Sequence, residues 1–461
     1  MNLSEDVKVF VNNIFVRFPA YIICTYFLVK KMIHHYLKQK STLKEEIPTK
    51  AHGILFGKKG RKIVYSPTDF EGHIAVFGGS GLGKTSALLI PTLQHWNGTS
   101  FTIDIAGDIC SKVDMPNKFI YEPANFRSNP YNIFGSIDQL KTETERNQAL
   151  EQLAFLLMPD DINSTDSGRF FQTEGRKILT ASLIAFYHQG FDFISIMEKI
   201  VQNSWKELFI QIDNTKNQKA IPYINSFQGA SEQNTAGCKQ ACDSAIKLFA
   251  TNDIIKKTIR RPNKNESAFS PEMLERNNVF IVIEDSKLKL YAPLLQIITA
   301  QSLDFFSSRS NQSETTILFC LDEFASLGKM DITDALRKLR KKHIRIMMLT
   351  QSMADIDLIY GKPERMAMMN NYKYKVILGA DDTDTQEYFA KLIGYKSTTK
   401  TSTSKNAKTT THTQTETKDF AIEPSDLARL GEDLILLHPD GYSKLKKNYY
   451  YKDSHHLSLF N

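Results

Sequence analysis

The sequence predicts an α/β fold built on a mixed, mainly parallel β-sheet. Short apolar runs typical of buried strands alternate with segments of helical periodicity, which is the pattern of strand–helix–strand units. One such run leads into a glycine-rich loop, and another ends in an Asp-Glu pair. Because the carboxyl ends of parallel strands meet at one edge of a sheet, the loop and the acidic pair are expected to share a site.

The glycine-rich loop is the clearest motif of the chain. Residues 78–85 have the spacing G-x-x-x-x-G-K-[ST], with a strand pattern at 74–77 before them and a helix pattern at 86–90 after them. An ordinary glycine-rich turn is the alternative, but the flanking strand and helix favour a loop whose backbone N–H groups surround phosphates. Lys84 is expected to reach the β and γ phosphates and Thr85 to bind Mg²⁺. The residues expected to bind nucleotide are Gly78, Gly79, Ser80, Gly81, Leu82, Gly83, Lys84, Thr85 and Ser86.

Composition places the chain among globular proteins. Its 461 residues, 41% apolar and 24% charged, are enough for two or three domains. A net charge of +7 suits nucleic acid or an anionic membrane surface without deciding between them. The five cysteines form no disulfide framework, which indicates a reducing compartment. Cys238 and Cys242 stand one helical turn apart without a second ligand pair, so a buried thiol pair is favoured over zinc.

The N-terminal region, residues 1–45, is predicted to be a membrane-anchor helix with a basic flank. Residues 9–29 are largely apolar but are interrupted four times, so that only 20–29 run without a break. That is shorter than the roughly 20 residues a membrane span needs. The basic flank at 30–40 is of the kind that stays in the cytoplasm. A single marginal anchor is the preferred interpretation, and an interfacial helix or a core helix are the alternatives.

The first part of the α/β domain is expected over residues 46–190. Two short strands fall within 53–65, and further strands at 100–105 and 118–121 carry Asp104 and Glu122 at their carboxyl ends. Helical periodicity covers 141–159 and 167–188. From 193 to 258 the pattern stays helical and polar without a convincing strand, which predicts an all-α insert domain over 191–270.

The second part of the α/β domain, over residues 271–461, contains the acidic pair. Strands are expected at 278–284 and 315–321, with a helix over 293–307 between them. Asp322 and Glu323 follow the second of these strands. Asp322 is expected to hold Mg²⁺ through water, and Glu323 to polarise an attacking water molecule.

A further strand, at residues 344–350, ends on Gln351, which can sense the γ phosphate. The basic cluster at 337–345 precedes this strand. Arg340 is the candidate for an arginine finger that reaches a neighbouring subunit's nucleotide, and a solvated helix face is the alternative. After a strand at 373–378, the Thr-, Ser- and Lys-rich segment 396–418 is expected to be an exposed low-complexity loop. Residues 434–437 and 446–451 are strand-like runs.

Taken together, these motifs resemble the conjugative DNA-transfer coupling proteins of type IV secretion, the TraG- and TraD-like ATPases. The resemblance covers roughly residues 53–453. The motifs that carry it are Gly-Gly-Ser-Gly-Leu-Gly-Lys-Thr-Ser at 78–86, Ile-Pro-Thr-Leu at 90–93, Asn-Pro-Tyr-Asn at 129–132, Leu-Asp-Glu-Phe-Ala-Ser-Leu-Gly at 321–328, Thr-Gln-Ser at 350–352, Tyr360-Gly361, Asn370-Asn371, Leu-Gly-Ala-Asp-Asp at 378–382 and Thr385. The later motifs are more specific than the phosphate loop.

The resemblance implies a RecA-like P-loop ATPase with an all-α insert, tethered to the cytoplasmic membrane and assembled as a homo-hexamer on DNA. Such a protein receives a relaxed single strand with its bound relaxase and drives it towards the secretion channel, using ATP and Mg²⁺. Carried over by position, Lys84 and Thr85 bind nucleotide and Mg²⁺, Asp322 and Glu323 form the hydrolytic pair, and Gln351 is the sensor.

The chain departs from the family pattern at two places, and two other functions remain as alternatives. Where the family usually shows Asp-Pro-Lys-Gly-Glu, this chain has Asp-Ile-Ala-Gly-Asp at 104–108, so Ala106 replaces the basic residue. The N-terminal region has room for one weak span where many relatives have two. The alternatives are a membrane receptor that docks relaxase or effector proteins, with nucleotide as a conformational switch, and a chromosomal DNA pump.

Overall fold

The computed structural model describes residues 44–46, 53–67, 72–105, 107–160, 164–313, 315–330, 332–406 and 409–452. The predicted anchor over 1–45 therefore lies almost entirely outside the described residues, as does Ala106. Within the described ranges, no helix combines the length and the apolar character that crossing a membrane requires.

The described residues form one large sheet of twelve strands, in the order β1-β3-β2-β14-β13-β10-β4-β9-β8-β5-β7-β6. The seven strands from β10 to β6 are mutually parallel, and the five from β1 to β13 are antiparallel to their neighbours. This confirms the predicted mixed, mainly parallel sheet. The strands are β1 (Lys44–Glu46), β2 (Leu55–Lys59), β3 (Lys62–Tyr65), β4 (His73–Phe77), β5 (Thr99–Ile105), β6 (Lys118–Tyr121), β7 (Asn278–Ile283), β8 (Ile317–Leu321), β9 (Ile344–Thr350), β10 (Tyr372–Ile377), β13 (Asp433–His438) and β14 (Gly441–Lys446).

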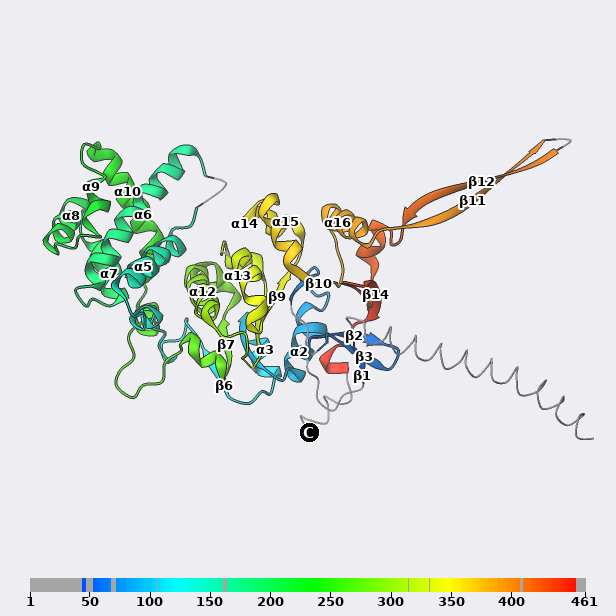
Figure 1. The fold of residues 1–461 in the computed structure, drawn as a ribbon, viewed down its shortest axis with the longest axis horizontal. Helices are drawn as coiled ribbons and strands as arrows, with labels where there is room; N and C mark the ends of the chain where they lie inside the picture. Colours follow the sequence, from blue (N-terminus) through cyan, green and yellow to red (C-terminus); the bar gives the residue numbers. More distant parts are fainter. Residues whose placement is uncertain are drawn as a thin grey trace, which may run out of the picture.

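Helices cover both faces of the sheet and extend beyond its β6 edge (Figure 1). They are α2 (Ile90–His95), α3 (Asp108–Lys112), α4 (Gly135–Asp138), α5 (Glu143–Leu157), α6 (Asp166–Tyr187), α7 (Phe193–Gln202), α8 (Trp205–Asn214), α9 (Ile221–Asn225), α10 (Glu232–Thr251), α11 (Asp253–Thr258), α12 (Asp285–Phe305), α13 (Ile332–Lys338), α14 (Met353–Tyr360), α15 (Lys362–Asn371) and α16 (Thr383–Ile393).

Alternation along the central strands explains the two apolar layers. All five residues of β4 are buried, with Ala75 and Phe77 in one hydrophobic cluster and Ile74 and Val76 in the other. Successive side chains of a strand point to opposite faces, so a strand that is covered on both sides is apolar along most of its length. The continuous apolar runs of the sequence are therefore the parallel strands of the sheet centre.

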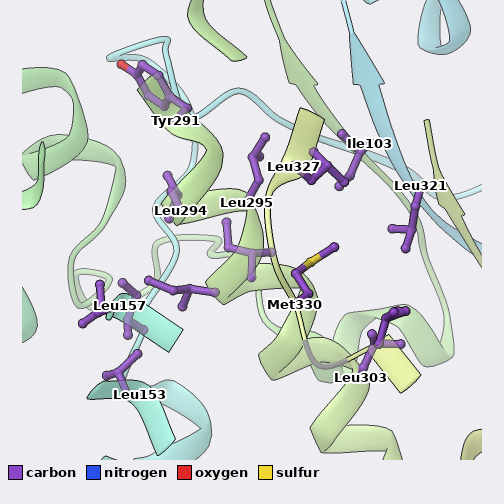
Figure 2. Close-up of a cluster of buried hydrophobic side chains, with 14 of the residues drawn as sticks. Ile103, Leu153, Leu157, Tyr291, Leu294, Leu295, Leu303, Leu321, Leu327 and Met330 are labelled. Atoms are coloured by element: carbon purple, nitrogen blue, oxygen red, sulfur yellow. The ribbon is translucent and has the colours of Figure 1, made fainter. Parts of the chain in front are cut away.

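Helix α12 joins the sheet to the helices at its edge. Figure 2 shows Leu294 and Leu295 of α12 between Ile103 of β5 and Leu157 of α5, all of them buried. Burying a leucine side chain stabilises the fold by about 1.5–3 kcal/mol. The single apolar cluster that includes these residues links the sheet to the helices beyond it.

Helices α5 to α11 pack mainly on one another, with α6 and α10 at their centre (Figure 1). A Cβ atom on Gly175 of α6 would lie 2.6 Å from the carbonyl oxygen of Cys238 on α10, so the glycine permits a close approach of the two helices. Cys238 and Cys242 are both buried at this contact. The group begins at Glu143, well before the predicted boundary at 191, because α5 and α6 direct apolar residues towards the other helices. The division into domains at 190 and 270 stays a prediction.

The expected loop over residues 396–418 is a β-hairpin, so that prediction was wrong. Strands β11 (Tyr395–Asn406) and β12 (Thr409–Phe420) pair antiparallel along their whole length and project from the body of the protein (Figure 1). Threonine is β-branched and favours extended backbone, which outweighs the lack of apolar residues. The rings of Tyr395 and Phe420 stack at the base of the hairpin, with centroids 4.9 Å apart.

The strand-like run predicted at 446–451 is also wrong. Strand β14 already ends at Lys446, which pairs with Lys58 of β2. The chain then leaves the sheet, and Tyr450–Lys452 form a 3₁₀ turn. The tyrosines pack near the phosphate loop instead of extending a strand, since a Cβ atom on Gly83 would lie 3.2 Å from the ring of Tyr449.

Candidate functional site

The candidate site lies at the carboxyl ends of three adjacent parallel strands. Strand β9 lies between β4 and β8, and it pairs with both. The segments that follow these strands therefore converge: the phosphate loop after β4, Gln351 after β9 and Asp322 after β8. The N–H of Gly78 donates to the carbonyl oxygen of Thr350 at 3.2 Å, which joins the first two segments directly.

The phosphate loop needs its glycines for two different reasons. Gly81 and Gly83 have φ values of 75° and 99°, in the left-handed region that L side chains rarely adopt. Gly79 has no room for a side chain, because its Cβ atom would lie 2.6 Å from a carboxylate oxygen of Asp381. The loop is thus held in a curved shape with its backbone exposed to a ligand.

The helix after the loop begins with a wide turn. Residues Lys84–Leu89 are π-helical, and the N–H of Ile90 bonds to the carbonyl oxygen of Thr85. Helix α2 then begins with Pro91 in its first turn. Proline has no N–H and its ring collides with the carbonyl four residues earlier, so a locally wider helix accommodates it. The helix predicted at 86–90 is therefore present in π-helical form.

Lys84 is almost fully buried and has two partners. Its Nζ donates to the carbonyl oxygen of Gly78 at 2.8 Å and lies 3.5 Å from a carboxylate oxygen of Glu323. A buried ammonium group requires such compensation, because its desolvation is costly. The predicted lysine and the predicted acid therefore meet in the same corner of the site.

Thr85 and Asp322 form the oxygen-rich part of the site. The Thr85 hydroxyl donates to Oδ2 of Asp322 at 3.3 Å, and the backbone N–H of Glu323 donates to Oδ1 of Asp322 at 3.1 Å. Burial, assisted by the neighbouring Glu323 carboxylate, raises the pKa of Asp322 to about 6. A hydroxyl beside a buried carboxylate is a donor set that Mg²⁺ prefers.

Glu323 is oriented by its backbone and by Gln351. Its φ of 45° is uncommon for a residue other than glycine. Nε2 of Gln351 donates to Oε2 of Glu323 at 3.2 Å, while Oε1 faces Lys84. The structure thus brings together Lys84, Thr85, Asp322, Glu323 and Gln351, as the sequence predicted from their places at strand ends.

Tyr360 supports the loop behind Glu323, and it was not among the predicted site residues. Its ring stacks on that of Phe324, with centroids 5.6 Å apart and planes within 6°. Its hydroxyl accepts from the N–H of Met330 at 3.2 Å and lies 3.4 Å from the carbonyl oxygen of Gly328. The Tyr360-Gly361 motif of the sequence was the available signal, although it did not reveal this partner.

The segment after β10 forms the opposite wall of the phosphate loop. A Cβ atom on Gly78 would lie 3.1 Å from Cβ of Leu378, and one on Gly379 would lie 2.5 Å from a methyl carbon of Leu82. Asp382 caps α16 by accepting from the N–H of Thr385, whose hydroxyl accepts from the N–H of Met353. These two hydrogen bonds connect the start of α16 to the start of α14.

Asp104 has a local structural role. It is fully buried, and its carboxylate accepts from the backbone N–H groups of Ile109 and Cys110 at the start of α3. Burial raises the pKa of Asp104, and these two hydrogen bonds oppose that shift. Glu122 accepts from the Asn125 side chain at 2.8 Å. Both acids stabilise the turns that follow their strands.

Arg340 lies away from the candidate site at the carboxyl ends of β4, β8 and β9. It falls in the 3₁₀ turn Leu339–Lys342 before β9, at the amino-terminal end of the parallel strands. Its charge, with that of Arg345, lowers the pKa of His73 at the start of β4, an effect smaller than that of burial. The five residues of β4 span roughly 16 Å between this position and the phosphate loop. Arg340 is therefore not part of the site within one chain, and a role in a neighbouring subunit stays a prediction.

The residues present fit the phosphates of a nucleotide with a divalent cation. The curved glycine backbone offers N–H groups, Lys84 offers a buried positive charge, and Thr85 with Asp322 offers paired oxygens. Neutral backbone donors and a cation recognise phosphate, and hard oxygen ligands recognise Mg²⁺.

The sequence resembles known proteins along most of its length. The model of the family "Type IV secretory system Conjugative DNA transfer" matches residues 28–459. Protein VirD4 of Rhizobium rhizogenes is 23% identical over 455 residues, covering 92% of this chain and 64% of that protein. The type IV secretion system-coupling protein VirD4 of Bartonella henselae is 20% identical over 352 residues, covering 72% of this chain and 54% of that protein. The chain thus spans less than two thirds of the length of these relatives.

Solved structures show the same fold. The bacterial conjugative coupling protein TrwBdeltaN70 in complex with sulphate has a TM-score of 0.69 at 18% identity, covering 87% of this chain and 90% of that chain. TrwB in complex with the ATP analogue ADPNP has a TM-score of 0.68 at 18% identity, with the same coverage. The family match covers most of the sequence, including the phosphate loop and the acidic pair, and the chain belongs to the conjugative DNA transfer family of type IV secretion.

Proposed function

We propose that this protein is an ATP-hydrolysing coupling protein that drives DNA towards a type IV secretion channel during conjugative transfer. The observation that carries the proposal is the convergence of Lys84, Glu323 and Gln351 at the ends of β4, β8 and β9. A buried cation, a carboxylate and an amide in one corner are the parts that phosphoryl transfer to water requires. TrwB, a structural neighbour, was solved with ADPNP and with ADP and Mg²⁺, which supports ATP as the nucleotide.

In this mechanism the residues of the chain have separate tasks. The phosphate loop, residues 78–86, binds the phosphates through backbone N–H groups, and Lys84 neutralises their charge. Thr85 and Asp322 would hold Mg²⁺, and the bound ion would offset the charge that develops on the phosphates. Glu323 accepts a proton from the attacking water, and the amide of Gln351 holds the Glu323 carboxylate in place.

The assembly that we propose follows from the family and from charge. Residues 1–45 serve as the anchor in the cytoplasmic membrane, residues 191–270 form the all-α insert, and six copies of the α/β domain assemble around DNA. In that assembly Arg340 reaches the nucleotide of a neighbouring subunit. The cargo is a single strand with its bound relaxase, and channel proteins are the further partners.

The purified protein tests the proposal through its ATPase rate with and without single-stranded DNA. We expect DNA to raise the rate and Lys84→Ala to reduce it by at least about 100-fold, because the variant loses a buried charge that faces the phosphates. Lys391→Ala is the matched control, since Lys391 is exposed and pairs with Glu387 on α16. A wild-type protein that binds ATP without turnover, or a Lys84→Ala variant that still transfers DNA, would favour a receptor in which nucleotide is only a switch.

A further inference from the structure

The loop that follows Glu323 is held from two sides. Tyr360, at the end of α14, contacts it on one side through the ring of Phe324 and the backbone of Gly328 and Met330. On the other side the Gln296 amide on α12 donates to the carbonyl oxygen of Leu327. The loop therefore has fixed contacts with two helices that come from distant parts of the sequence.

The two contacts restrict the backbone conformation of this loop. A Cβ atom on Gly328 would lie 2.2 Å from Nε2 of Gln296, and φ at Gly328 is 80°, so this position requires glycine. Phe324 and Leu327 are fully buried. Glu323 itself has a positive φ, a backbone conformation that persists only where the surroundings fix it.

Each of the two helices also contacts another part of the molecule. Helix α14 begins directly after Gln351 and Ser352, which caps it. Helix α12 packs on α5, and its Gln301 binds both the hydroxyl of Tyr131 and the carbonyl oxygen of Ile133 at the base of the helical group. Gln296 and Tyr360 are thus the points at which these two elements touch the loop of Glu323.

We propose that Tyr360 and Gln296 are positioning residues for Glu323. Both side chains act by holding residues 324–330, so that the Glu323 carboxylate keeps its place beside Gln351 and Lys84. The inference rests on the proposed ATPase function and assigns to these two residues a share in its rate. Displacement of a catalytic group by about 1 Å can reduce a rate substantially, which explains why remote hydrogen bonds matter.

The experiment measures kcat, KM and ATP affinity for Tyr360→Phe and Gln296→Met. Tyr360→Phe keeps the ring on Phe324 and removes only the hydroxyl, and Gln296→Met keeps the side-chain length and removes the amide. We expect kcat to fall about fivefold to tenfold in each variant, with KM and ATP affinity within twofold of wild type. Tyr121→Phe and Gln172→Met are the matched controls, because they remove a buried hydroxyl and a helix amide whose hydrogen bonds go to Thr258 and Pro159, away from this loop.

The same substitutions in a Glu323→Gln background separate positioning from general stability. A residue that acts through Glu323 has no further effect once the carboxylate is gone, whereas a residue that merely stabilises the fold lowers the remaining activity and the melting temperature again. Equal losses in both backgrounds, or wild-type kcat in both variants, would overturn the inference. A wild-type protein without any ATP turnover would instead overturn the proposed function.

Discussion

The two halves of the sheet differ in what the strand direction allows. In the parallel half, from β10 to β6, every strand ends at the same edge, so residues far apart in sequence meet there, as Lys84 and Glu323 do at 3.5 Å. In the antiparallel half, from β1 to β13, successive strands reverse, and their pairings are mostly local along the chain. The comparison teaches that the candidate site belongs to the parallel half, while the antiparallel half extends the sheet. After β14, the last strand of that half, the chain forms the turn Tyr450–Lys452 and brings Tyr449 near the phosphate loop.

The largest expected effect tests the parallel half directly. Glu323→Gln should reduce the ATPase rate by about 10²- to 10³-fold, because the amide cannot accept a proton from water. Nucleotide affinity, measured by calorimetry, should be equal to or tighter than that of wild type. The matched control is Glu284→Gln, which lies directly after β7 at the same edge of the sheet and pairs with Lys287 on the surface. A similar loss of ATPase rate in Glu323→Gln and Glu284→Gln would contradict a specific role for Glu323.

The second prediction concerns Asp322, where function and stability are expected to change in opposite directions. Asp322→Asn should lower the rate by about 10- to 100-fold, since a ligand shell of Mg²⁺ is weakened. The nucleotide-free protein should gain stability at pH 7. Burial raises the pKa of Asp322 from 3.8 to about 6, so the folded state binds this proton more tightly than the unfolded chain does. The stability of the wild-type protein therefore falls as pH rises through that window.

Denaturant unfolding of the Asp322→Asn variant at two pH values measures this effect. We expect the variant to exceed wild type by about 1–3 kcal/mol at pH 7, after allowance for the hydrogen bonds that the amide loses. The difference should be close to zero at pH 4, where the carboxyl of the wild type is largely protonated in the folded protein. A variant that is less stable than wild type at pH 7 would contradict the assignment of Asp322 as a desolvated carboxylate.

The smallest expected effect on basal activity concerns the β11–β12 hairpin, which falls between β10 and β13 in the sequence. Replacement of residues 397–418 by a short Gly/Ser turn leaves the Tyr395–Phe420 stack in place. The basal ATPase rate should stay within twofold of wild type, because among the described strands β11 and β12 form a sheet of their own, apart from the twelve-stranded sheet. The segment has Lys400, Lys405, Lys408 and Lys418 against Glu416, so the slope of log DNA affinity against log salt should decrease by about 2 to 3. An unchanged slope would indicate that the hairpin does not contact DNA.

Much of the parallel half could be predicted from the sequence. Strands β4, β8 and β9 are continuous apolar runs because both of their faces are covered, and such runs are easily recognised. The polar residue that follows each strand then falls at the common edge. Strand ends alone therefore predict that Asp322, Glu323 and Gln351 share one site.

The rest could not be predicted, because it depends on contacts between distant residues or on weak local signals. Tyr360 meets Phe324 only once α14 folds against the loop, and no periodicity reveals that pairing. The hairpin has no apolar pattern, and only the β-branched threonines favour its strands. The packing of α5 and α6 on the helices that follow them was also hidden, because an amphipathic helix does not reveal which partner covers its apolar face.

In the proposed mechanism, the ion pair between Lys84 and Glu323 makes the catalytic base a competitor of the phosphate for the Lys84 ammonium group. A phosphate that binds Lys84 must draw the ammonium away from Glu323, and in doing so it releases the carboxylate that the attacking water needs. Binding of the phosphate and release of the Glu323 carboxylate would then be one event. On the same proposal, release of the product would return Lys84 to Glu323 and so restore the resting state of the site.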